Sequence, residues 1–177
     1  NSYSIGKRAA ETLCVSYAFE YGVESVIARP GHIYGPTASP CDNRVSSIWA
    51  YAAANGKDIV MKSEGTQLRS YCYCLDCASA ILKILLKGES VHAYNISNPN
   101  SIVSIKDMAE IYAMTAGVKL VRTEATEREK KGFNPMNNSS LDSTSLQALG
   151  WRGLFDAKRG GSHTVSILKE MIGKTEV

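Results

Sequence analysis

The spacing of apolar residues along the chain predicts a mixed α/β fold. Over residues 3–21 the apolar side chains recur at helical spacing, and the glycine that follows ends this predicted helix. Residues 24–29 form a short β-rich run closed by Pro30-Gly31, which is typical of a buried strand. Residues 31–42 are rich in Gly, Pro and Ser and are therefore predicted to form a loop.

Helical spacing and short β-rich runs also assign the remaining elements. Further helices are predicted at residues 43–55, 76–87, 104–116 and 157–172, with a short one capped by Asp142 and ended by Gly150. Further strands are predicted at residues 58–61, 69–74, 93–96 and 119–121, and the Asn-rich segment 123–140 is predicted to be a surface loop. Ser104 followed by Asp107 is the pattern of a capped helix start. Because helix and strand alternate over the first 100 residues, we expect a parallel α/β sheet, followed by a mostly helical part.

Composition and charge exclude several functional classes. The 177 residues suffice for one domain with its own core, and 44% hydrophobic with 21% charged residues is ordinary for a globular protein. The net charge of +3 is too small to indicate binding to nucleic acid or to a membrane surface. No apolar run is long enough to cross a bilayer. We therefore predict neither a nucleic-acid nor a membrane partner.

The five cysteines admit two interpretations. An odd number without secretory signals favours free thiols in a reducing compartment, and we predict a cytoplasmic protein. Cys72, Cys74 and Cys77 have a spacing that invites a metal site, but they lie in or next to an apolar run that is typical of a buried strand. A zinc site needs four ligands, and no second pair with CxxC spacing exists. We predict no metal; a cysteine-based metal or redox module is the alternative.

The first residues carry the candidate chemistry. Tyr3 and Lys7 are four positions apart, which puts both side chains on one face of a helix. A phenol normally titrates near about pH 10, and a neighbouring ammonium favours its ionised form. Such a pair would exchange a proton with a sugar hydroxyl during hydride transfer. A chance pair of surface residues is the alternative interpretation of this spacing.

Three later motifs strengthen the catalytic interpretation. They are Arg-Pro-Gly-His-Ile-Tyr-Gly-Pro at residues 29–36, Gly-Thr-Gln-Leu-Arg-Ser-Tyr at residues 65–71 followed by Tyr73 and Asp76, and Leu141-Asp142 ahead of Leu146, Leu149 and Gly150-Trp151. In this order and at these intervals, the chain resembles the extended short-chain dehydrogenase/reductase family. It looks most like the nucleotide-sugar enzymes, namely UDP-glucose 4-epimerases, UDP-glucuronate decarboxylases and dTDP-glucose 4,6-dehydratases. The resemblance covers nearly the whole chain but only the second half of such an enzyme.

The resemblance implies a fold, a cofactor and a division of the chain. It implies the C-terminal part of a Rossmann-like parallel sheet with a smaller, mostly helical substrate-binding region, and NAD as the cofactor. Residues 1–100 would be the second half of the NAD-binding domain with interleaved substrate-binding segments, and residues 101–177 mainly the substrate-binding region. Tyr3 would be the catalytic acid/base, while Lys7 would favour its ionised form and bind the nicotinamide ribose.

The resemblance also implies a substrate pocket for a nucleotide-diphosphate sugar. Arg69 matches the family arginine that contacts the diphosphate, and its planar fork of donors suits phosphate oxygens; a surface salt bridge is the alternative. Arg44 and Val45 lie where the family helix borders the nucleotide base; a solvated helix start is the alternative. The family loop that passes the nicotinamide corresponds to Pro30, Gly31, His32 and Ile33.

Several departures from the family pattern limit what this chain would do alone. His32 stands where these enzymes often carry an Asn that helps to bind the sugar diphosphate; a loop-packing role is its alternative. Segment 133–140 lacks the second arginine of many relatives. The Gly-rich phosphate loop and the Ser or Thr that completes the catalytic group are also missing from the sequence. We therefore expect a truncated piece that is inactive without the N-terminal Rossmann half.

A second hypothesis from another functional class stays open. The chain would then be a non-catalytic module that binds a sugar nucleotide or assembles subunits. In the family that the chain resembles, the helix carrying the Tyr is commonly at the dimer interface. The apolar face of residues 3–21 fits that role, so we predict a homodimer.

Overall fold

The computed structural model describes residues 2–175 as a mixed α/β protein, which confirms the predicted fold class. Its helices are α1 (Ser2–Tyr21), α2 (Val45–Ala54), α3 (Cys74–Lys87), α4 (Ile105–Ala116), α5 (Glu127–Lys130), α6 (Thr144–Ala148) and α7 (Ala157–Thr175), with a 3-10 turn η1 (Pro99–Ser101). Its strands are β1 (Ile27–Pro30), β2 (His32–Tyr34), β3 (Ile59–Met61), β4 (Leu68–Tyr73), β5 (Ala93–Ile96), β6 (Ile102–Ser104) and β7 (Leu120–Arg122). No helix in this part of the chain is long and apolar enough to cross a membrane.

Each predicted helix and strand has a counterpart in the structure, with boundaries that differ by at most three residues. The loop prediction for residues 31–42 was wrong at β2, because three residues are too few to show a period and β2 forms through pairing with the distant β4. The loop prediction for residues 123–140 was wrong at α5, a single turn held by the capping box of Thr126 and Glu129. The cap of α6 is Ser143 rather than Asp142, although Asp142 accepts the N–H of Thr144 at 2.9 Å.

The strands form three small sheets. β1 pairs in parallel with β5, and β3 pairs in parallel with β7. β4 lies between β2, to which it is parallel, and β6, to which it is antiparallel. The carboxyl ends of β1 and β5 lead into Gly31 and Ser97, so the chain crosses from the first sheet to the second at Gly31.

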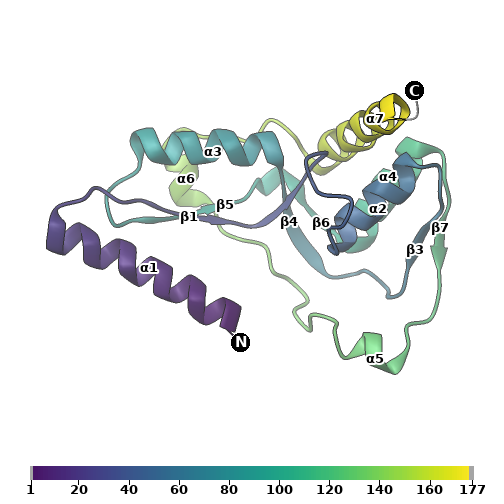
Figure 1. The fold of residues 1–177 in the computed structure, drawn as a ribbon, viewed down its shortest axis with the longest axis horizontal. Coiled ribbons are helices and arrows are strands. Elements are labelled where there is room, and N and C mark those ends of the chain that lie inside the picture. Colours follow the sequence, from purple (N-terminus) through teal and green to yellow (C-terminus); the bar gives the residue numbers. More distant parts are fainter. Residues whose placement is uncertain (1, 176–177) are drawn as a thin grey trace.

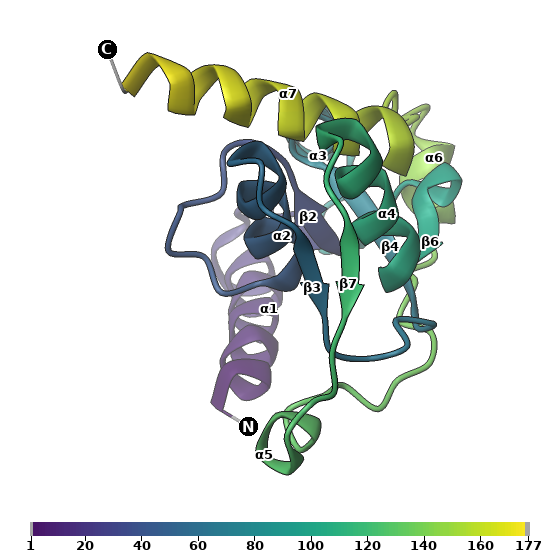
Figure 2. The same ribbon diagram turned by 90° about the vertical axis from the view of Figure 1, so that its right-hand side faces the viewer.

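Two regions of the molecule differ in how they are packed. The open region consists of α1, β1, β5, α3 and α6, with α1 and α3 on opposite sides of the β1–β5 pair (Figure 1). The helical region consists of α2, α4 and α7 together with β3 and β7. Its three helices pack against one another, and α7 lies across the other two (Figure 2).

Each region packs on a separate apolar core. The core of the helical region joins residues of α2, α4 and α7 to the tyrosines of β2 and β4. The smaller core of the open region lies between α3, β5 and α6 and includes Cys72, Cys77 and Trp151. The predicted capping box of Ser104 and Asp107 starts α4, and Gly117 ends it in the left-handed conformation. The division of the chain at residue 100 stays a prediction.

Candidate functional site

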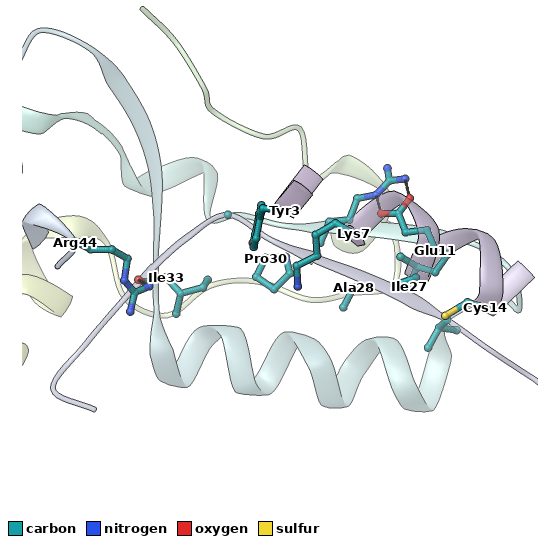
Figure 3. A pocket seen from close by; sticks show the side chains of 13 residues that line it. Tyr3, Lys7, Glu11, Cys14, Ile27, Ala28, Pro30, Ile33 and Arg44 are labelled. Atoms are coloured by element: carbon teal, nitrogen blue, oxygen red, sulfur yellow. Dashed lines mark hydrogen bonds and ion pairs between the residues drawn. The ribbon is translucent and has the colours of Figure 1, made fainter. Parts of the chain in front are cut away.

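Tyr3 and Lys7 lie on one face of α1, as their spacing predicts. The Nζ atom of Lys7 is 5.6 Å from the centre of the Tyr3 ring. Tyr3 is 72% exposed, so its hydroxyl is open to a ligand rather than packed in the core. Both side chains project from α1 over β1 and Pro30 (Figure 3). Their catalytic role stays a prediction, but their geometry permits it.

These two side chains line a pocket of about 570 Å³, here called the α1 pocket. Residues of β1 and β2, among them Pro30 and Ile33, also line this pocket, together with Gly31 between the two strands. The N–H of Gly31 donates to the carbonyl of Ile96, and a Cβ at this position would come within 3.2 Å of that oxygen. Glycine therefore allows the chain to pass close to β5 on its way from β1 to β2.

The pair Glu11–Arg29 also lines the α1 pocket, and the sequence analysis missed it. Two hydrogen bonds of 2.7 and 2.6 Å join the guanidinium of Arg29 on β1 to the carboxylate of Glu11 on α1. These bonds hold the pKa of Glu11 below its ordinary value. The positions 3, 7 and 11 share one helical face, and this spacing was the available signal. Glu11 forms its ion pair with Arg29, and Lys7 has no carboxylate partner within residues 2–175.

A second pocket, of about 260 Å³, adjoins the first and is here called the cationic pocket. It contains a histidine and two arginines and has no acidic residue in its lining: Gly31, His32, Ile33, Arg44, Val45, Ser46, Arg69, Tyr71 and Ile105. Gly31, Ile33 and Arg44 line both pockets. The structure therefore brings together all the residues that the resemblance assigned to cofactor and substrate.

Arg69 is the most deeply buried charge of the cationic pocket. Its side chain belongs to β4, and the residue is only 5% exposed. Its guanidinium donates to the carbonyls of Leu68, at 2.7 Å, and Met136, at 3.2 Å. Within residues 2–175 no carboxylate forms an ion pair with it, which argues against the salt-bridge alternative. A buried cation without a counter-charge is costly, and an anionic ligand would offset that cost.

Arg44 and His32 hold defined positions at the rim of the cationic pocket. The guanidinium of Arg44 is bound to the carboxylate of Asp42, and this bond holds the pKa of Asp42 well below its usual range. The Nε2 atom of His32 lies 3.1 Å from the Oγ atom of Ser139, a residue that the sequence analysis did not assign. Burial of part of the ring and the charge of Arg69 lower the pKa of His32.

Two tyrosines and two thiols near the pockets are unsuited to proton transfer at neutral pH. Burial raises the pKa of Tyr71 and of Tyr73 to about 12. The thiols of Cys72 and Cys77 are buried, as predicted, and burial raises the pKa of both. No group of three His, Cys, Asp or Glu side chains in the described part of the chain is arranged to hold a metal ion.

Comparison with known proteins identifies related sequences and structures. Residues 1–97 match the NAD dependent epimerase/dehydratase family. UDP-glucuronic acid decarboxylase 6 of Arabidopsis thaliana is 29% identical over 161 residues, which are 89% of this chain and 45% of that protein. The UDP-glucose 4-epimerase of Thermus thermophilus, solved with NAD, superposes with a TM-score of 0.80 at 25% identity, over 94% of this chain and 53% of the other.

A third relative shares the fold at lower identity. The UDP-glucose 4-epimerase of Thermotoga maritima, solved with UDP-glucose, superposes with a TM-score of 0.83 at 22% identity, over 96% of this chain and 54% of the other. The chain thus spans about half the length of these three relatives.

Proposed function

The chain belongs to the NAD dependent epimerase/dehydratase family, and from this premise we propose that it forms the catalytic and substrate-binding half of a nucleotide-sugar epimerase or dehydratase. The reaction begins with transient oxidation of a sugar hydroxyl. The observation that carries the proposal is the junction of the two pockets, since the Tyr3–Lys7 face meets the cationic pocket at Gly31, Ile33 and Arg44.

Proton transfer is the task of Tyr3. Its exposed hydroxyl faces the α1 pocket, where it would take the proton of the sugar hydroxyl and later return it. Lys7 is one helical turn away and its charge is not neutralised by a carboxylate of the described chain. This arrangement places a positive charge beside the group that would transfer the proton.

The α1 pocket fits the nicotinamide end of NAD, which supplies the hydride acceptor when bound. Lys7 and Tyr3 offer donors to the ribose hydroxyls, and Pro30, Gly31 and Ile33 offer an apolar wall and backbone groups to the flat ring. His32 follows Gly31 on the side of the cationic pocket, where its imidazole faces the substrate. The Thermus thermophilus epimerase, solved with NAD, supports the choice of cofactor.

The cationic pocket fits the diphosphate of a nucleotide sugar. Arg69 supplies a buried guanidinium without a counter-charge, and His32 lies beside it. Arg44 and Val45 begin α2 at the rim of the pocket, where they would border the nucleotide. The Thermotoga maritima epimerase, solved with UDP-glucose, supports the substrate class.

We further propose that the chain acts together with an N-terminal Rossmann half and as a homodimer in the cytoplasm. No Gly-rich phosphate loop is present in the 177 residues. Within the described chain, β1 pairs only with β5, and its residues 28–30 are exposed, so a further strand has a free edge to join. α1 buries none of its residues, and a helix with so much free surface suits a subunit interface. The same observation is compatible with the alternative of an assembly module. The five free thiols favour a reducing compartment.

The experiment compares the chain alone with a longer chain that adds the Gly-rich half before residue 1. We expect no turnover of nucleotide sugars by residues 1–177 and clear turnover by the longer protein. Tyr3→Phe in the longer protein should lower kcat by about 10²–10⁴-fold, because it removes the group that transfers the proton. Tyr17→Phe, on the same helix and outside the α1 pocket, is the matched control and should retain activity. Turnover by the isolated chain, or full activity of Tyr3→Phe, would contradict the proposal.

A further inference from the structure

His32 differs from the other charged or ionisable side chains of the cationic pocket in one respect. Arg44 and Arg69 keep their charge at all physiological pH values, and the pKa of Tyr71 is raised to about 12 by burial. An imidazole ordinarily titrates near about pH 6.5, close to neutrality. The total charge of the cationic pocket near neutral pH therefore depends on His32.

We propose that His32 takes up a proton when the cationic pocket binds the diphosphate of a nucleotide sugar, so that substrate affinity rises as the pH falls. The inference rests on the function proposed above and adds a regulatory property to the same site. Its chemical basis is the attraction between an imidazolium and phosphate oxygens at a site whose buried cation is Arg69.

The position of the ring is fixed by a segment from a distant part of the chain. Residues 136–141 run beside β4, with hydrogen bonds from Leu68 N to the Asn137 carbonyl at 2.8 Å and from Ser139 N to the Leu68 carbonyl at 3.1 Å. Ser139 then contacts Nε2 of His32 at 3.1 Å. The same segment accepts a hydrogen bond from Arg69 through the Met136 carbonyl, so His32 and Arg69 are held by one support.

Among the groups that face His32, the charge of Arg69 disfavours its charged form when the pocket holds no anion. From β4 His32 faces Arg69 and Tyr71, whose ring centre is 6.0 Å from that of His32, and from the start of α2 it faces Arg44, which is paired with Asp42. From α4 the pocket is lined by Ile105, and the neighbouring Lys106 is paired with Glu110 at 3.4 Å. No carboxylate lines this pocket.

The sign of the pH effect follows from these neighbours. Burial and the Arg69 charge lower the pKa of His32 in the ligand-free protein, which disfavours the charged ring. A bound diphosphate brings negative charge to the ring and raises its pKa. Affinity is then constant above the pKa of the complex, increases as the pH falls toward the pKa of the free protein, and levels off below it.

The test is calorimetric titration of the chain with UDP-glucose from about pH 5.5 to about pH 8.5, a range that brackets an ordinary imidazole. Both phosphates of UDP-glucose are esterified, so the ligand itself does not titrate there. We expect binding at least about threefold tighter at the acid end, and net proton uptake when buffers of different ionisation enthalpy are compared. His32→Asn, which retains a donor toward Ser139, should bind with an affinity that does not change with pH. His92→Asn, outside the cationic pocket, is the matched control and should behave as the wild type.

Each outcome separates this inference from the function on which it rests. If the wild type binds equally at every pH, or if His32→Asn keeps the pH dependence, the role of His32 is refuted and the diphosphate pocket stands. If the folded wild type does not bind UDP-glucose at any pH, the diphosphate pocket itself is refuted, and the role of His32 with it.

Discussion

The open region and the helical region stabilise their helices in different ways. In the helical region, α4 buries Met108, Ala109, Tyr112 and Ala113 against α2 and α7. In the open region, α1 is longer but buries none of its residues, and Phe19 remains 81% exposed. The helices of the helical region therefore pack on a core, whereas the helix that carries the proposed catalytic pair still has apolar surface to be covered.

Polar contacts tie α1 to the segment that follows it. Glu11 bonds to Arg29 on β1, and the Ser25 hydroxyl donates to the Cys14 carbonyl at 3.0 Å. Exposed ion pairs contribute little to stability compared with a buried apolar face. The proposed catalytic geometry therefore depends on contacts that are weak in this chain. A further protein layer packed over α1 would stabilise it.

The largest expected difference concerns matched truncations of one apolar side chain in each region. Met108→Ala, at a fully buried position of α4, should lower the free energy of unfolding by about 2–5 kcal/mol because it leaves a cavity. Leu13→Ala, at a position of α1 that is 59% exposed, should change it by less than about 0.5 kcal/mol. Urea denaturation of both variants measures the contrast. Equal losses would mean that α1 is packed more tightly than its exposure indicates.

A smaller effect is expected from the ion pair that ties α1 to β1. Glu11→Gln should cost less than about 1 kcal/mol of global stability yet accelerate amide hydrogen exchange along α1 more than along α4. The Arg29 bond lowers the pKa of Glu11, so this stabilisation is present above the ordinary carboxyl value and is lost as acid protonates the folded state. Glu20→Gln, on the same helix without a recorded ion pair, is the control. Unchanged exchange in Glu11→Gln would show that the pair does not hold the helix.

Much of the fold could be predicted because each long element carries its own signal. The period of residues 3–21 and the Ser104–Asp107 capping box were sufficient to locate α1 and α4. β2 and α5 could not be found in this way, because one is made by long-range pairing and the other by a single turn of capping. The exposure of the apolar face of α1 could not be predicted from the sequence either. An apolar face indicates a contact, but it does not show whether the contacting surface lies in the same chain.

The candidate site was predictable where chemistry and local spacing coincide. Tyr3 and Lys7 are one turn apart in any helix, so their shared face followed from the sequence alone. The adjoining positions of Arg69 and His32 required the resemblance to a family, because β2 and β4 are far apart in the chain. Ser139 was missed because its contact with His32 spans 107 residues and leaves no local pattern.

The central claim is that Tyr3, with Lys7 beside it, takes the proton of a sugar hydroxyl during its oxidation. The most direct measurement is a single turnover of the longer, NAD-loaded protein, with the near-ultraviolet absorbance of reduced nicotinamide followed after addition of a nucleotide sugar. The account predicts a rapid rise in the wild type and in Tyr17→Phe, and a rise slowed by about 10²-fold or more in Tyr3→Phe. An equally rapid rise in Tyr3→Phe would contradict it.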